Sequence, residues 1–170
     1  MQIGLRPLRR EDSELLYQWI VDRKLLVLNA PYLPVSEVDH EAWVESMLVK
    51  RTDLVMFVIE DLATGRAIGT CQLYGINWIH RNAELQIRIG DIAAQSRGLG
   101  VQAVNLLVDF GFKDLNLHRI YLHVFATNTR AIRAYEKCGF AREGVLRQAA
   151  HVDGGFVDVL SMALLRSDHG

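Results

Sequence analysis

The spacing of apolar and polar positions divides the chain into strands and helices. Residues 83–90 alternate most clearly, with apolar side chains on one face of the predicted strand and polar side chains on the other. Other apolar runs predict strands over residues 2–8, 54–60, 67–74, 119–125, 145–152 and 156–165. Helical spacing predicts helices that begin near Asp12 or Ser13 and after Ser36, and helices over residues 99–113 and 129–137. Residues 25–35 contain Pro31 and Pro34 and are predicted to be a loop.

The order of these elements predicts the fold class. A strand and two helices are followed by three strands, and then by a helix, a strand, a helix and a final hairpin around Asp153-Gly154-Gly155. This order favours an α/β (α+β) fold, with a mixed, mostly antiparallel sheet of about seven strands and helices on both faces. The 170 residues show neither an internal repeat nor a linker, so we expect a single domain over residues 1–170.

Composition and charge narrow the classes of protein. Half of the residues are apolar and the formal net charge is −1, which argues against a nucleic-acid-binding protein, because such proteins usually carry a basic excess. The longest apolar run has six residues (54–59), far short of the roughly 20 that span a bilayer, and the N-terminus is too polar for a signal peptide. With only two cysteines, a disulfide framework is excluded, and the histidines show no metal-ligand spacing. We therefore expect a cytoplasmic protein with no membrane association and no metal.

A glycine-containing loop follows the alternating strand. It reads Gln95-Ser96-Arg97-Gly98-Leu99-Gly100 and leads directly into the predicted helix 99–113. Two glycines leave the backbone open to a ligand, and the first N–H groups of the helix together with its dipole favour an anion there. Arg97 is placed to add a charge-assisted bond. The pattern suits a pyrophosphate, although a simple turn entering a helix would read the same way.

A second motif begins 28 residues after Gly100, with Asn128 at a strand-to-helix turn. It reads Asn128-Thr-Arg-Ala131-Ile-Arg-Ala-Tyr135-Glu-Lys-Cys-Gly139-Phe140, and Ala131 and Tyr135 share one helix face. The Gln-x-x-Gly-x-Gly loop followed by Asn-x-x-Ala-x-x-x-Tyr-x-Lys-x-Gly-Phe resembles the GNAT superfamily of acetyl-CoA-dependent N-acetyltransferases. The element order from about Leu5 to Leu165 is also similar to that fold.

The resemblance implies roles for specific residues, with acetyl-CoA as the cosubstrate. Backbone amides would hold the coenzyme pyrophosphate along Gln95, Ser96, Arg97, Gly98, Leu99, Gly100 and Val101. The strand edge at Ile87, Arg88 and Ile89 would pair with the pantetheine arm. Asn128 and Ala131 would lie at the coenzyme, and Tyr135 would lie beside the thioester sulfur.

The chemistry of acetyl transfer to an amine requires a proton acceptor and a proton donor. An alkyl amine with a pKa near 10.4 is almost wholly protonated at pH 7, and forming the neutral nucleophile costs about 4.6 kcal/mol. Glu84 is the candidate acceptor, directly or through water, although a strand carboxylate paired with Arg81 or Arg88 is equally consistent with the sequence. Tyr135 is the candidate donor to the departing thiolate. No histidine is spaced to activate Cys138, so we expect direct transfer.

The identity of the amine is less constrained. Residues 76–87 and 110–117 are similar to bacterial spermidine N-acetyltransferases, so a polyamine or another small amine is the first candidate. Residues 25–49 carry four acidic and no basic side chains, and Glu37, Glu41 and Asp158 are candidate amine-binding residues. A protein N-terminus such as that of a ribosomal protein, an amino-sugar nucleotide, and an inactive coenzyme-binding module remain alternatives. The resemblance also favours a homo-oligomer.

Overall fold

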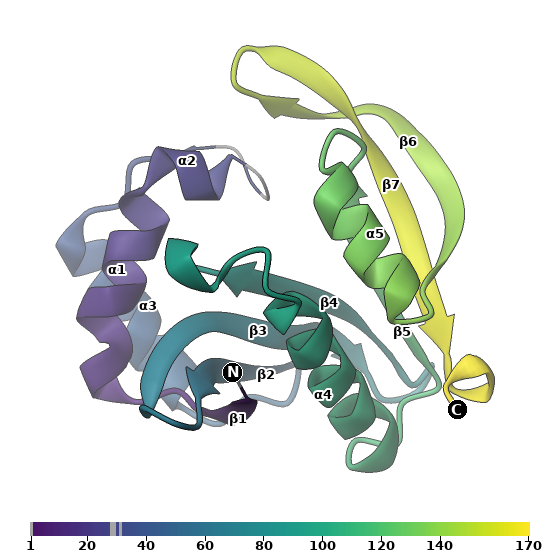
Figure 1. The fold of residues 1–170 in the computed structure, drawn as a ribbon, viewed down its shortest axis with the longest axis horizontal. Helices are drawn as coiled ribbons and strands as arrows, with labels where there is room; N and C mark the ends of the chain where they lie inside the picture. The colour runs from purple at the N-terminus through teal and green to yellow at the C-terminus, as the bar shows by residue number, and fades with distance from the viewer. Residues whose placement is uncertain (1, 28–29, 31) are drawn as a thin grey trace.

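The computed structural model describes residues 2–27, 30 and 32–170. Within these residues, seven strands form one sheet in the order β1-β2-β3-β4-β5-β7-β6 (Figure 1). The strands are β1 (Ile3–Pro7), β2 (Leu54–Asp61), β3 (Arg66–Asn77), β4 (Asn82–Ile89), β5 (Arg119–Phe125), β6 (Ala141–Val152) and β7 (Gly155–Leu165). The helices are α1 (Ser13–Val21), α2 (Arg23–Leu26), α3 (Glu37–Leu48), α4 (Leu99–Lys113) and α5 (Thr129–Lys137). The predicted mixed α/β sheet is confirmed.

The sheet parts in its middle. Neighbouring strands are antiparallel except β4 and β5, which are parallel and pair only from Asn82↔Arg119 to Glu84↔Tyr121. Beyond Glu84 the two strands separate, as Figure 1 shows, while β5 stays paired with β7 along its whole length. The C-terminal half of β4 therefore presents a main-chain edge that its neighbour β5 does not cover.

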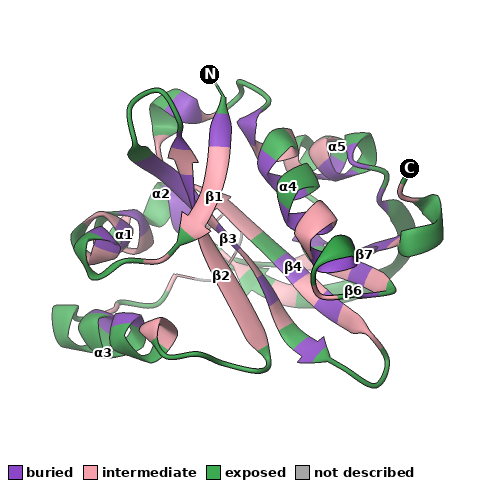
Figure 2. Ribbon diagram, turned by 90° about the horizontal axis from the view of Figure 1, so that it is seen from below, coloured by how far each residue is buried: buried purple, intermediate pink, exposed green. Residues whose placement is uncertain are grey.

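Helices pack on both faces of the sheet. On β2, the ring of Phe57 meets that of Phe110 in α4 with a centroid distance of 5.0 Å. The next residue, Val58, lies instead in a buried cluster with Leu16 and Trp19 of α1. Because successive strand residues point to opposite faces, α4 covers one face and α1 the other, and the central strands between them are buried or half-buried (Figure 2). None of the described helices is long and apolar enough to cross a membrane.

Two sequence-based boundaries were wrong. The predicted loop 25–35 begins inside the short helix α2, where the Asp22 side chain accepts the Lys24 N–H at 2.9 Å; residues 28, 29 and 31 lie outside the described residues. Strand β6 begins at Ala141 instead of 145. Its pairing with β7 shifts at Arg142/Gly144 and again at Leu146/Ala150, and these bulges hide the alternation on which the prediction depended.

Candidate active site

Glu84 lies at the point where β4 and β5 part. Its Oε1 is 2.8 Å from Nδ1 of His123, which β5 carries two residues beyond Tyr121, the register partner of Glu84. On the other side, Tyr74 of β3 pairs with Glu84 in the antiparallel register. Burial raises the pKa of Tyr74, and so do its hydrogen bond to Glu84 and the charge of that carboxylate. The Tyr74 hydroxyl therefore keeps its proton and acts as a donor to Glu84.

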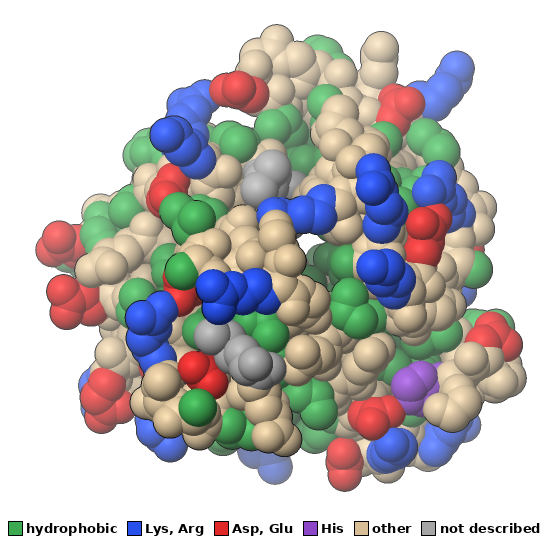
Figure 3. Space-filling view, viewed as in Figure 1, with side chains coloured by type: hydrophobic (Ala, Val, Ile, Leu, Met, Phe, Trp, Pro, Cys, Tyr) green, Lys and Arg blue, Asp and Glu red, His purple; other side chains and the backbone are tan. Residues whose placement is uncertain are grey.

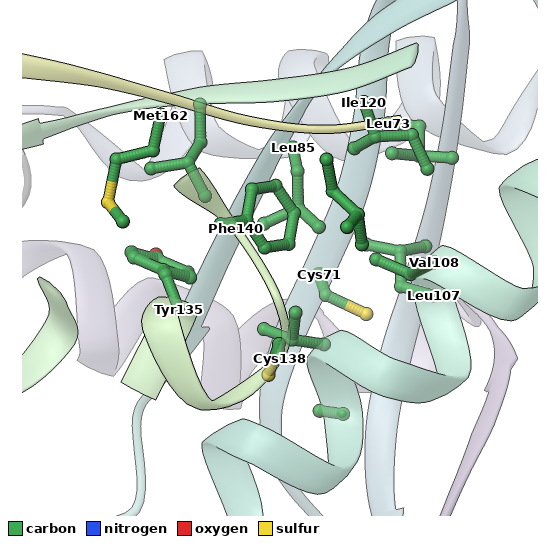
Figure 4. Packing of buried hydrophobic residues seen from close by; sticks show 14 of the residues in the cluster. Cys71, Leu73, Leu85, Leu107, Val108, Ile120, Tyr135, Cys138, Phe140 and Met162 are labelled. Atoms are coloured by element: carbon green, nitrogen blue, oxygen red, sulfur yellow. The ribbon is translucent and has the colours of Figure 1, made fainter. Parts of the chain in front are cut away.

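Tyr135 completes this central cavity, a space of about 240 Å³ that Glu84, His123 and Tyr135 line together. The tyrosine is only 8% exposed and packs in the main core beside Phe140 and Met162 (Figure 4). Burial, and to a lesser degree the charge of Cys138, raise the pKa of Tyr135 to about 12. Its hydroxyl therefore remains protonated at neutral pH and is available as a proton donor.

The glycine loop forms a second cavity with β4 and α5. Gly98 precedes α4 with a φ of +74°, and a Cβ added at Gly98 or Gly100 would find open space within 4 Å. The Gln95 side chain fixes the loop: its Nε2 donates to the Ile89 carbonyl at 3.1 Å, and its Oε1 accepts from Arg130 at 3.3 Å. The first N–H groups of α4 lack acceptors within the helix. At Gly98 and Gly100 they face a space that no side chain obstructs.

This loop-side cavity has a volume of about 390 Å³. It is lined by most of the residues that the resemblance singled out: Ile87, Arg88, Ile89, Gln95, Ser96, Gly98, Gly100, Val101, Asn128, Ala131 and Tyr135. The Leu99 side chain is buried in the core at 2% exposure, so only its backbone is available. Arg97 is exposed and lies outside the lining. Asn128 also caps α5, where its Oδ1 accepts the Ala131 N–H at 3.2 Å.

Most cations of the loop-side cavity come from α5, within the basic stretch 129–147 that the sequence reasoning places beside an anionic coenzyme, and Arg88 of β4 adds another. Arg130, Arg133 and Lys137 line it, and Figure 3 shows Lys and Arg side chains gathered along this helix beside the hollow. Their spacing of three and four residues places them on one helix face, a signal that was readable in the sequence. Bare backbone, helix-start N–H groups and three cations fit a ligand with phosphate groups, such as coenzyme A.

A third, helix-side cavity of about 520 Å³ lies on the opposite face of β4, against α1 and α3. Its walls are apolar and aromatic, with Trp19 of α1 and Trp43 of α3 among them. Polar side chains reach it from the sheet, including those of Gln86 and Arg88. Ile87 lines all three cavities, so the spaces converge at the residue where β4 lies free of β5.

The predicted amine-binding carboxylates lie elsewhere. Glu37 and Glu41 are exposed on α3, and neither lines one of the three cavities. Asp158 has a structural partner: its Oδ1 accepts the N–H of Gln148 at 2.8 Å, where Gln148 adopts a φ of +51° in a bulge of β6. Their role toward an amine therefore stays a prediction that this geometry does not support. Among the described residues, no group of three His, Cys, Asp or Glu side chains is placed to hold a metal.

Comparison with known proteins identifies the family. Residues 2–141 match the model of the acetyltransferase (GNAT) domain. The chain is 34% identical to spermidine N(1)-acetyltransferase of Vibrio cholerae over 99% of its own length and 95% of the relative's, and 33% identical to the Escherichia coli enzyme of that name over 98% and 88%. It is also 26% identical to an aminoglycoside N(6')-acetyltransferase of Klebsiella pneumoniae over 85% and 76%.

A solved structure extends the likeness to three dimensions. The crystal structure of spermidine N-acetyltransferase from Vibrio cholerae in complex with CoA and spermine superposes with a TM-score of 0.90 at 34% identity, over 98% of this chain and 97% of that one. The chain therefore belongs to the GNAT family and is an acetyl-CoA-dependent N-acetyltransferase.

Proposed function

We propose that this chain, acting as one domain over residues 1–170, transfers acetyl from acetyl-CoA directly to a primary amine of a polyamine or another small amine. The full-length likeness to spermidine acetyltransferases supports a small amine acceptor. The observation that carries the proposal is the convergence of three cavities at Ile87, beside Glu84, His123 and Tyr135.

The loop-side cavity is the proposed coenzyme site. Its helix-start N–H groups and the cations Arg130, Arg133 and Lys137 would hold the phosphate groups. The free edge of β4 at Ile87–Ile89 would pair with the amide groups of the pantetheine arm, as an added strand does. When bound there, the coenzyme supplies the activated acetyl group, and the chain positions it beside Tyr135.

Glu84 and His123 are the proposed proton acceptors. An imidazole is a stronger base than a carboxylate, so His123 is better matched than Glu84 to an ammonium that must give up its proton. Because their side chains are 2.8 Å apart, Glu84 can orient the amine while the proton passes to the pair. Tyr74 would hold the carboxylate in place from the other side.

Tyr135 is the proposed proton donor. With a pKa of about 12 it stands about 3.5 units above a free thiol, so complete transfer to a solvated thiolate is uphill by about 5 kcal/mol. The same burial that raises the pKa of the tyrosine also destabilises a thiolate beside it. Protonation is therefore expected to accompany cleavage of the carbon–sulfur bond, with the hydroxyl already in position.

The experiment measures acetyl-CoA-dependent thiol release with spermidine, spermine, an amino sugar and short peptides. We expect turnover of at least one small amine and a drop in kcat of about 100-fold or more in Glu84→Gln, because that variant keeps the shape but loses the base. The matched control is Glu14→Gln, the same substitution at an exposed carboxylate of α1 that lines none of the three cavities. Binding of acetyl-CoA without turnover of any amine would favour an inactive coenzyme-binding module. Preference for peptides would favour N-terminal acetylation.

The exposed edge of the sheet and the buried cysteines bear on the oligomeric state and the cellular location. We propose a homo-oligomer, because β6 is an edge strand and the β6–β7 hairpin exposes Val145, Leu146 and Phe156. Size-exclusion chromatography with light scattering tests it, and a monomer at micromolar concentration would contradict it. A cytoplasmic location is supported by Cys71 and Cys138, which are buried free thiols suited to a reducing compartment, and cell fractionation tests it.

A further inference from the structure

Two cations of α5 have no partner within the part of the chain that the structure describes. Arg133 and Lys137 line the loop-side cavity and are exposed, and neither makes a hydrogen bond or an ion pair with a described residue. The acid of α5, Glu136, is bound instead by Arg142, with an Nη2–Oε1 distance of 2.7 Å. The described lining of this cavity contains neither Asp nor Glu. Both cations therefore stay available to an anion in the cavity.

Two contacts hold α5 alongside the glycine loop. Near the start of the helix, the Arg130 guanidinium lies 3.3 Å from Oε1 of Gln95. Just after its end, Sγ of Cys138 lies 3.7 Å from the carbonyl oxygen of Val101, in the first turn of α4. The two unpaired cations come between these contacts along the helix, so they flank the loop on the side of the cavity.

The phosphate groups of coenzyme A lie in two separate places on that molecule. Its pyrophosphate would meet the helix-start N–H groups and Arg130, which already lies against the loop. The two phosphates of that group share one oxygen, so together they span about one helical turn, roughly 5.4 Å. Arg130 and Lys137 are seven residues apart, which is about 10.5 Å along the helix axis. The far end of α5 can therefore bind a second anion, and the 3′-phosphate is a monoester with a charge of about −1.5 to −2 at pH 7.

We propose that Arg133 and Lys137 bind the 3′-phosphate of the coenzyme, so that the chain selects acetyl-CoA over 3′-dephospho-acetyl-CoA. This inference rests on the proposed function and deepens its coenzyme site, and it makes no demand on the acceptor amine. The two side chains are four residues apart on one helix face, with Cβ atoms about 5–6 Å apart, so both can reach one phosphate group. They are exposed at the rim of the cavity, whereas Tyr135 at its buried side would take the thioester. The nucleotide end of the coenzyme would therefore lie beside them.

Paired coenzymes that differ only in the 3′-phosphate test this selection. We expect the wild-type KM for 3′-dephospho-acetyl-CoA to exceed that for acetyl-CoA about tenfold or more. Arg133→Gln and Lys137→Gln should each raise the KM for acetyl-CoA about three- to tenfold and leave the KM for the dephospho form within about twofold. Arg133→Lys and Lys137→Arg keep the charge and should keep most of the preference. The control Arg147→Gln removes an exposed cation of β6 that lines none of the three cavities, and both KM values should stay within about twofold.

Calorimetric binding of CoA and 3′-dephospho-CoA, measured without an acceptor, separates this inference from the proposed function. A preference for CoA of about tenfold that depends on Arg133 and Lys137, with no turnover of any amine, would sustain the inference and overturn the proposed transfer. Equal dissociation constants for the two coenzymes would overturn the inference even if amines are acetylated. It would also fall if the two glutamine variants weakened both coenzymes to the same extent, because the cations would then serve the pyrophosphate or the adenine.

Discussion

Two glycines of α4 allow the coenzyme site to be tested apart from stability. Gly100 lies in the first turn, where an added Cβ would meet no protein atom within 4 Å and would point into the loop-side cavity's space. Gly111 lies in the last turn, where an added Cβ would come within 2.7 Å of Ile120 Cδ1 and 3.0 Å of Leu73 Cδ1. The same substitution by alanine should therefore have opposite consequences at the two positions.

The stability changes follow from helix propensity and packing. Alanine is favoured over glycine by about 1 kcal/mol inside a helix, and we take about 0.5 kcal/mol for the first turn at Gly100. At Gly111 the same gain is offset by overpacking, which costs about 1–3 kcal/mol in a closed core, since Ile120 and Leu73 are both 0% exposed. We expect Gly100→Ala to raise the Tm by about 1–2 °C and Gly111→Ala to lower it by about 2–4 °C.

Coenzyme binding should be weakened by the stabilising variant, Gly100→Ala, and left intact by the destabilising one, Gly111→Ala. The Gly100→Ala methyl group occupies space that the phosphate groups need to approach the helix-start N–H groups, so the KM for acetyl-CoA should rise about tenfold, equivalent to about 1.4 kcal/mol. Gly111→Ala should leave that KM within about twofold. Thermal unfolding and thiol-release kinetics on both variants provide the comparison. An unchanged KM in Gly100→Ala would refute the placement of the coenzyme at this loop.

Two further variants test the donor and a buried ion pair. Tyr135→Phe should lower kcat about 100-fold with little change in KM for acetyl-CoA, and an unchanged kcat would exclude Tyr135 as the donor. Because the pKa of Tyr135 is about 12, the wild-type rate should not fall with rising pH on account of this group below about pH 10. Burial raises the pKa of Asp12, but its hydrogen bonds from Arg6 and Arg9 lower that pKa on balance. Asp12→Asn should therefore lower the free energy of unfolding at pH 7 by about 3 kcal/mol. Denaturant titration should find this difference constant above about pH 5 and smaller as the pH falls below about 4.

The local parts of the site were predictable from the sequence. The alternation of residues 83–90, the glycine loop and the Asn128–Tyr135 spacing each depend on short-range geometry, and the structure brings most of these residues to one cavity. The contact between Glu84 and His123 was not predictable, because it spans 39 residues and depends on the register of two parallel strands. The alternation of side chains along β5 places His123 on the same face as Tyr121. Only the register between β4 and β5 sets Tyr121 opposite Glu84.

The helix-side cavity was missed for a related reason. Its members come from α1, α2, α3, β2, β3, β4 and the segments between them, and no motif joins them. Arg88 stood out in the sequence only as a polar residue of an alternating strand. In the structure Arg88 lines both the helix-side and the loop-side cavity, which its place in the sequence does not indicate.

The acidic side chains of residues 25–49 show why a local charge count does not locate the surface that binds the acceptor. The acidic side chains Glu37, Glu41 and Glu45 are spaced by four residues and share the exposed side of α3, where Glu45 pairs with Arg10 at 2.8 Å. His40, Trp43 and Met47 occupy the other side of the same helix and line the helix-side cavity. None of the described carboxylates of this segment lines the helix-side cavity, even though the segment carries a balance of −4. Selectivity for the amine should follow the face of the helix and not its net charge.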